Sequence, residues 1–172
     1  MHGENNKRYQ WIARSADRWE VIPPLVLFVV IEFFIIFLPT EPIFFAALFV
    51  NPKRWLRFSG AMVGGKVIAV AIVYFAMSQI PLERVHAFAA DAGMAAVWSR
   101  CEVFFARYGA VSLGITALLP LPMFFVTAIA AVSGVGLARL ELFAFLGLGV
   151  RYAILSWLGV NSRQWVERWV LR

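Results

Sequence analysis

Four charged side chains lie within long apolar stretches of the sequence, and they are the residues best placed to do chemistry. Glu32 and Glu41 share the first stretch, whereas Lys66 and Arg151 lie in two later ones. An arginine or lysine at the centre of a membrane helix costs at least about 2.5–3.5 kcal/mol. Such residues therefore face the protein interior, where they can pair with each other, bind an anion or, for a carboxylate, carry a proton.

Each of the four residues has a functional and a structural interpretation. Arg151 lies near the middle of its stretch, so its guanidinium cannot easily reach the membrane surface and is expected to bind an acid or an anionic ligand. Glu41 is expected to be a proton carrier or the ion-pair partner of Arg151 or Lys66. Lys66 could instead extend to the cytoplasmic surface, and Glu32 could lie near the headgroups or face a water cavity. The structural alternative for all four is an ion pair that only fixes the fold.

The sequence contains no arrangement typical of catalysis or of metal binding. Its two histidines, His2 and His86, are far apart, and its one cysteine is Cys101, so no intrachain disulfide is possible. It has no glycine-rich phosphate loop and no pair of aspartates within an apolar stretch. We therefore expect neither an enzyme nor a metal or cofactor site.

The composition is typical of an integral membrane protein with a single domain. Of 172 residues, 62% are hydrophobic and only 15% are charged, compared with about 45–50% and about 25% in soluble domains. This excludes a disordered chain, a nucleic-acid-binding domain and most soluble enzymes. The net charge of +6 lies mostly outside the apolar stretches, so we expect it to orient the chain in the membrane.

Four apolar stretches predict the membrane elements. Ranges 61–79 and 142–160 have the length of one spanning helix, whereas 21–50 and 110–137 are too long for one span and too short for two. A pair of prolines interrupts each long stretch, and a proline ends a helix because it lacks the backbone donor and clashes with the preceding turn. We expect each long stretch to be a re-entrant helical hairpin. The prolines that break the hairpins are Pro39, Pro42, Pro120 and Pro122.

Basic residues favour hairpins over four full spans. Lysines and arginines flank both ends of range 21–50, and basic segments favour the cytoplasmic side. Four full spans would place Lys53, Arg54 and Arg57 outside, against this rule. The hairpin arrangement places both termini in the cytoplasm.

Three polar segments complete the expected organisation. Residues 1–20 form a cytoplasmic or interfacial segment, 81–109 an outer helical segment, and 161–172 an amphipathic tail at the membrane surface. At the start of the first span, Gly60 and Gly64 have the spacing of a glycine pair that packs closely against another helix.

The two halves of the chain resemble each other. Each has a proline break, then a basic turn, then a span with an internal cation, and the spacing from Arg54 to Lys66 equals that from Arg139 to Arg151. One explanation of this likeness is chance, because apolar segments resemble each other easily. The other is an internal repeat, which predicts an all-α membrane protein of two inverted repeats, each a re-entrant hairpin followed by a spanning helix. Many secondary transporters are built in this way.

The order of these features resembles the DedA superfamily, also called the SNARE-associated or VTT-domain family. The resemblance covers roughly residues 30 to 160 and is closest to the short YqaA-like members. It is carried by FLPTEP at 37–42, GAMVGGK at 60–66, RYGAVSLGITALLPLP at 107–122, AAVSG at 130–134 and GLGVRY at 147–152.

The resemblance implies a protein of the bacterial inner membrane with two inverted re-entrant hairpins. Family members are implicated in moving lipids across the bilayer, including undecaprenyl phosphate, in proton-coupled transport and in envelope stability. Typical members carry arginines three residues before and three residues after the second-break proline. Here these positions hold Ala117 and Met123, so a phosphate would have to be bound by other cations, with Arg151 and Lys66 as the candidates.

The expected function is therefore a small transporter of a phosphate-bearing lipid, such as a polyprenyl phosphate or a phospholipid, or of another anion. Its partners would be membrane lipids and protons, with homo-oligomers possible and no nucleic acid. Two alternatives are a non-transport scaffold or envelope-integrity factor, in which the charges only lock the fold, and an ion or oxyanion carrier.

Overall fold

The computed structural model describes the backbone of residues 19–35, 41–119, 121 and 123–170, with side chains from residue 20 to residue 161 apart from Val50. Pro39, Pro120 and Pro122, most of segment 1–20 and the last two residues lie outside this description, and the predicted tail 161–172 continues α9 to Val170. The described residues are helical and contain no strand. The elements are η1 (Trp19–Val21), α2 (Ile22–Phe34), α3 (Glu41–Val50), η2 (Pro52–Arg54), α4 (Trp55–Met77), α5 (Leu82–Asp91), α6 (Ala95–Tyr108), α7 (Val111–Leu118), α8 (Met123–Val132) and α9 (Leu137–Val170).

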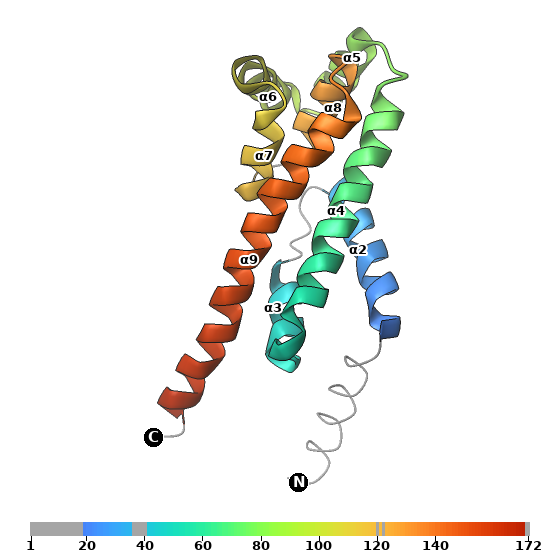
Figure 1. Cartoon of the computed structure of the whole chain (residues 1–172). Helices are drawn as coiled ribbons and strands as arrows, with labels where there is room; N and C mark the ends of the chain where they lie inside the picture. The colour runs from blue at the N-terminus through green and yellow to red at the C-terminus, as the bar shows by residue number, and fades with distance from the viewer. Residues whose placement is uncertain (1–18, 36–40, 120, 122, 171–172) are drawn as a thin grey trace.

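Two long helices, α4 and α9, pack against each other along the centre of the molecule (Figure 1). Among the described residues, Pro52–Met77 and Leu137–Asn161 are the helices long and apolar enough to cross a membrane. Helix α9 contains all of the predicted span 142–160, whereas α4 covers the predicted span 61–79 only as far as Met77, and both begin earlier than predicted, at Trp55 and at Leu137. The turn predicted at Arg139 is wrong, because arginine and leucine are good helix formers and α9 extends through it, whereas Arg54 lies in the short helix η2 that precedes α4.

Four short helices surround the central pair. In Figure 1, α2 and α3 lie beside the end of the molecule where α4 begins, whereas α7 and α8 lie beside the opposite end, where α9 begins. The main packing partner of α2 is α4, and that of α7 is α9, whereas α3 also packs on α9 and α8 on α4. Each long helix thus contacts short helices from both halves of the chain.

The ends of the short helices follow from proline chemistry. Pro42 is the second residue of α3, a position where the missing backbone donor costs nothing. Helix α7 ends at Leu118, and Leu119 has an extended backbone, as expected for a residue that precedes a proline. Helix α8 then begins at Met123. The proline-rich segments therefore separate helices in both halves of the chain.

The predicted outer segment 81–109 consists of α5 and α6, which cap one end of the molecule. A 2.6 Å contact between His86 Nε2 and Glu102 Oε1 joins the two helices at an exposed position. Trp98 of α6 is buried and lies edge-on to Phe125 of α8, which attaches the cap to the bundle. Gly109, with φ of +57°, makes the turn from α6 to α7, a conformation that favours glycine.

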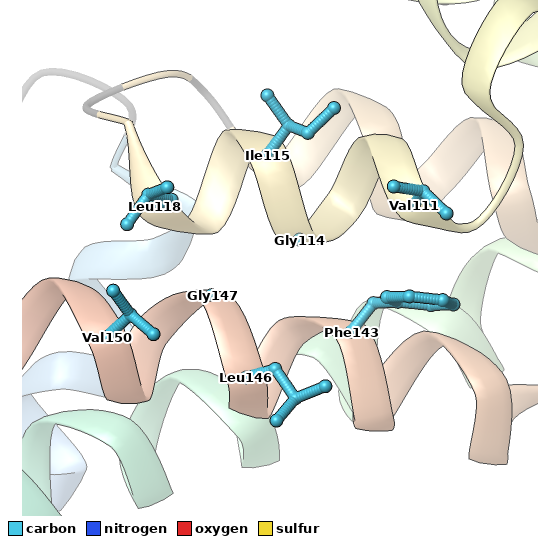
Figure 2. Close-up of a pocket in the computed structure, with 8 residues that line it drawn as sticks. All are labelled: Val111, Gly114, Ile115, Leu118, Phe143, Leu146, Gly147 and Val150. Atoms are coloured by element: carbon cyan, nitrogen blue, oxygen red, sulfur yellow. The ribbon is translucent and has the colours of Figure 1, made fainter.

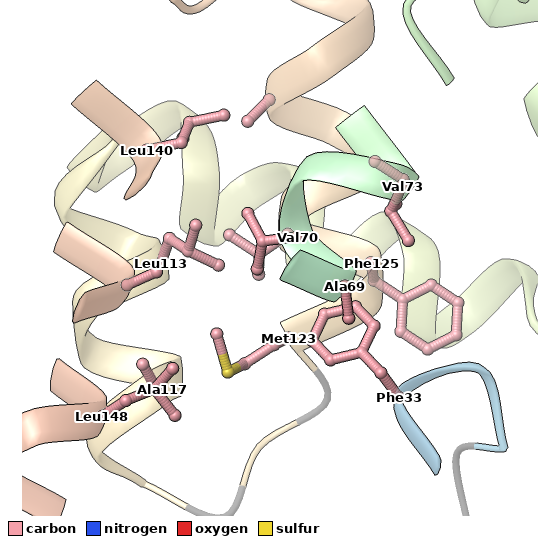
Figure 3. Packing of buried hydrophobic residues seen from close by; sticks show 14 of the residues in the cluster. Phe33, Ala69, Val70, Val73, Leu113, Ala117, Met123, Phe125, Leu140 and Leu148 are labelled. Carbon is pink, nitrogen blue, oxygen red and sulfur yellow. The ribbon is translucent and has the colours of Figure 1, made fainter. Parts of the chain in front are cut away.

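The core lies where the two short helices of the second half meet α4 and α9. Figure 3 shows Met123 among Val70 of α4, Leu113 and Ala117 of α7, and Leu148 of α9. Met123 and Ala117 are both buried and packed in this cluster. Both positions at which the resemblance would lead one to expect arginines therefore hold apolar core side chains.

The prediction that Gly60 and Gly64 pack closely against another helix is wrong. A β-carbon at either position would meet no neighbouring atom within 4 Å. The adjacent Gly65 makes the contact instead, because Val29 of α2 lies where its β-carbon would be, at 2.8 Å. The second close approach is between Gly114 of α7 and Gly147 of α9, where a β-carbon on Gly147 would overlap the Gly114 carbonyl oxygen.

Candidate functional site

A buried ion pair joins Lys66 of α4 to Glu32 of α2. Lys66 Nζ lies 2.9 Å from Glu32 Oε2, and the two side chains are only 9% and 13% exposed. The contact lies one residue from Gly65, where α2 and α4 come closest. Lys66 is buried and does not extend to the surface, which was one of its two predicted interpretations.

A second ion pair joins Arg151 of α9 to Glu41, the first residue of α3. Arg151 Nη2 donates to Glu41 Oε1, and Nη1 donates to the carbonyl oxygen of Leu119, at a distance of 3.3 Å. Leu119 follows the last residue of α7 and precedes Pro120. One guanidinium therefore holds together a long helix and the two segments at which the short helices of the two halves are interrupted.

The two ion pairs differ in how much of each acid is accessible. Glu41 is 31% exposed and Arg151 is 12% exposed, so the carboxylate can be reached from outside the core. Glu41 also lies in the first turn of α3, where the helix dipole stabilises a negative charge. Because an arginine has five N–H donors, Arg151 can bind an additional anion beside its two described partners.

Ion pairing among Glu41, Glu32, Lys66 and Arg151 was one of their predicted interpretations, and the sequence left open which acid meets which cation. The structure pairs Glu41 with Arg151 and Glu32 with Lys66, and no contact between the two pairs is described. Tyr152, next to Arg151, is buried edge-on against Phe44 of α3, with ring centroids 5.0 Å apart. This aromatic contact fixes α3 beside the guanidinium.

Two features of the site were missed from the sequence. The first is the Leu119 carbonyl, which the general rule that helix ends leave unsatisfied carbonyl groups would have suggested. The second is a buried 2.8 Å hydrogen bond between the hydroxyl groups of Ser59 and Ser156, which links α4 to α9. Lone serines in apolar helices indicate such links, but they do not identify the partner.

An apolar groove lies beside the second ion pair, between α7 and α9 (Figure 2). Its volume is about 260 Å³, and only apolar side chains and glycines line it. Gly114 and Gly147 form its floor, because the two helices touch there. Leu118 and Val150 form one end of the groove, and the next residues along the chain are Leu119 and Arg151.

No group of three or more histidine, cysteine, aspartate or glutamate residues that could hold a metal ion occurs in the parts of the chain that the structure describes. No protein-family model, curated protein or solved structure matches the chain. The similarity to the DedA superfamily therefore depends on the sequence motifs alone and remains a prediction.

Proposed function

We propose that the protein is a small DedA-like transporter of the bacterial inner membrane. Its substrate would be a phosphate-bearing lipid, a polyprenyl phosphate or a phospholipid, or another anion. The observation that carries the proposal is the position of Arg151, whose guanidinium contacts both Glu41 and the Leu119 carbonyl. A charged group at this depth in an apolar helix is costly, which favours a functional role.

The proposed membrane arrangement has α2 and α3 entering from one side and α7 and α8 from the other. The exchange of packing partners supports two inverted repeats, because α3 contacts α9 and α8 contacts α4. The helix breaks would then meet near the middle of the membrane, as in other inverted-repeat transporters. The start of α2 and the end of α9 would both lie at the cytoplasmic face.

The arrangement can be tested with single cysteines at the helix breaks in a Cys101→Ala background. Membrane-impermeant thiol reagents added outside should not label Thr40→Cys, and reagents confined to the cytoplasm should not label Leu121→Cys. Labelling of either cysteine from the opposite side would show a full span instead of a hairpin.

In the proposed mechanism, Arg151 alternates between Glu41 and a phosphate group. When Glu41 is ionised, it holds the guanidinium across the halves; protonation of Glu41 removes this attraction and leaves the donors for the substrate. The N-terminus of α3 adds backbone N–H groups that favour an anion. Arg151 would thus replace the arginines that typical family members carry where this chain has Ala117 and Met123.

Transport by reconstituted protein tests the proposal. A labelled polyprenyl phosphate or phospholipid should move between vesicle leaflets, and Glu41→Gln and Arg151→Ala should each abolish this movement. The matched controls are Glu83→Gln and Arg84→Ala, which change exposed charges on α5 and should leave it unaltered. Full activity of both site variants would exclude the mechanism, and movement of inorganic phosphate without lipid would favour an oxyanion carrier.

A scaffold function is the second candidate, since each charge of the two pairs already has a protein partner. In that case the charges only fix the fold. Each single variant, Glu41→Arg or Arg151→Glu, should then impair envelope integrity, and the double variant with exchanged charges should restore it. Transport by Arg151 instead requires the cation at its own position, so the exchanged protein should stay inactive.

A further inference from the structure

We infer that the groove between α7 and α9 holds the hydrocarbon chain of an anionic, phosphate-bearing lipid whose headgroup lies at Arg151. The inference rests on the proposed function and goes further, because it assigns the place of the hydrocarbon chain. It has three steps: the lining of the groove, the charge at its end, and the contrast with the α2–α4 contact in the first half.

The lining of the groove fits a hydrocarbon chain. No polar side chain interrupts it, and its floor is flat because glycines replace side chains on both helices, at Gly114 and Gly147. Figure 2 shows Leu118 and Val150 facing each other at one end and Val111 and Phe143 at the other. At 1.5 Å per residue, α7 offers about 12 Å of groove, so the chain would continue from it into the bilayer.

The charge at one end of the groove fits an anionic headgroup. The groove ends at Leu118 and Val150, and the next two residues, Leu119 and Arg151, are joined by a hydrogen bond from Nη1 to the carbonyl oxygen. A phosphate at this point could accept hydrogen bonds from the Arg151 N–H groups that do not bond to Glu41 or Leu119. A lipid would therefore place its two chemically different parts on two adjoining surfaces that match them.

The glycine contact between α2 and α4, in the first half, is closed. There the side chain of Val29 occupies the space above Gly65, with two carbons 2.8 Å from the position of a β-carbon. The nearby cation, Lys66, is held within the same half by Glu32 and is buried. The inferred binding surface therefore belongs to the α7–α9 contact and not to every glycine contact of the protein.

Photo-crosslinking in nanodiscs tests the inference with the full chain. The probe is phosphatidic acid with a diazirine in its acyl chain, and the matched probe is a diacylglycerol with the same chain and no phosphate. Phosphatidic acid should crosslink to Ile115 and Leu146, which line the groove, several fold more than to Ile68 and Ile72, which are exposed on α4. They should fall several fold with diacylglycerol and in Arg151→Gln.

Equal crosslinking of both faces, or no dependence on the headgroup, would overturn the inference, since the groove would then be ordinary lipid-facing surface. Leu146→Trp, which enlarges a side chain that lines the groove, should reduce crosslinking at Ile115, while Ile72→Trp should not. Inorganic phosphate should compete poorly; equal competition would mean that the chain contributes nothing. Transport without groove crosslinks would refute only this inference, whereas groove crosslinks without transport would refute only the proposed function.

Discussion

The α2–α4 and α7–α9 contacts are built alike, but the first is filled by side chains and the second is bordered by a groove. In each, a short helix meets a long one at a glycine, and a cation of the long helix lies close by along the chain. At the first contact Val29 fills the space and Lys66 pairs with Glu32 of the same contact. At the second a groove remains, and Arg151 reaches across to Glu41 in the other half.

The difference indicates that two similar ion pairs have different tasks. The Lys66–Glu32 pair is enclosed and fastens α2 to α4, so it stabilises one half of the molecule. The Arg151–Glu41 pair is more accessible and joins the two halves. A protein that changes shape between its halves would break the second pair while keeping the first.

The largest expected effect on stability is at the closed contact. Lys66→Met leaves the carboxylate of Glu32 buried without its partner, and breaking a buried ion pair in this way costs about 3–5 kcal/mol. Thermal unfolding in detergent should show the loss. The double variant Lys66→Met with Glu32→Leu should recover most of it, because two apolar side chains need no partner. If the double variant does not recover this stability, the ion pair does more than hold α2 against α4.

A smaller loss of stability is expected when a side chain is added at the glycine contact between α7 and α9. Gly147→Ala places a β-carbon against the Gly114 carbonyl, and overpacking of this kind typically costs about 1–3 kcal/mol. Gly64→Ala is the matched control, since its β-carbon meets no atom within 4 Å. Unfolding temperatures of the two variants measure the contrast. Equal temperatures would contradict the close approach of the two helices.

A moderate loss of stability is expected when the hydrogen bond between Ser59 of α4 and Ser156 of α9 is removed. Ser59→Ala leaves the buried hydroxyl of Ser156 without its described partner, and we expect a loss of about 0.5–1.5 kcal/mol in the free energy of unfolding. Adding Ser156→Ala should bring little further loss, which a double-mutant cycle measures. Purely additive losses would show that the two hydroxyl groups do not interact.

The smallest effect is at Cys101 of α6, which belongs to neither contact. Burial raises the pKa of its thiol, so less thiolate is present at a given pH than for a free cysteine. The neutral thiol is favoured in the folded state, and the stability this gives is lost as the pH rises through the raised pKa. Alkylation of Cys101 should be slow near neutral pH and reach its plateau at a higher pH than a model thiol. A plateau at the ordinary pH would contradict the burial.

The sequence by itself determined the features that depend on local chemistry. The prolines and apolar lengths predicted where helices are interrupted, and the two long helices occur where spans were expected, although both begin earlier than predicted. Burial cost predicted an interior partner for Arg151, because an isolated charge in an apolar helix is unfavourable whatever the fold, and it left a position at the membrane surface open for Lys66 and Glu32.

Only the tertiary structure decided which groups meet. The helices are apolar on most sides, so their periodicity does not reveal which face contacts a neighbour. Gly64 and Gly65 are adjacent in sequence, yet only Gly65 faces α2. The pairing of Arg151 with Glu41 and the groove beside it depend in the same way on how α3, α7 and α9 are placed together, and that placement is set by contacts between residues far apart along the chain.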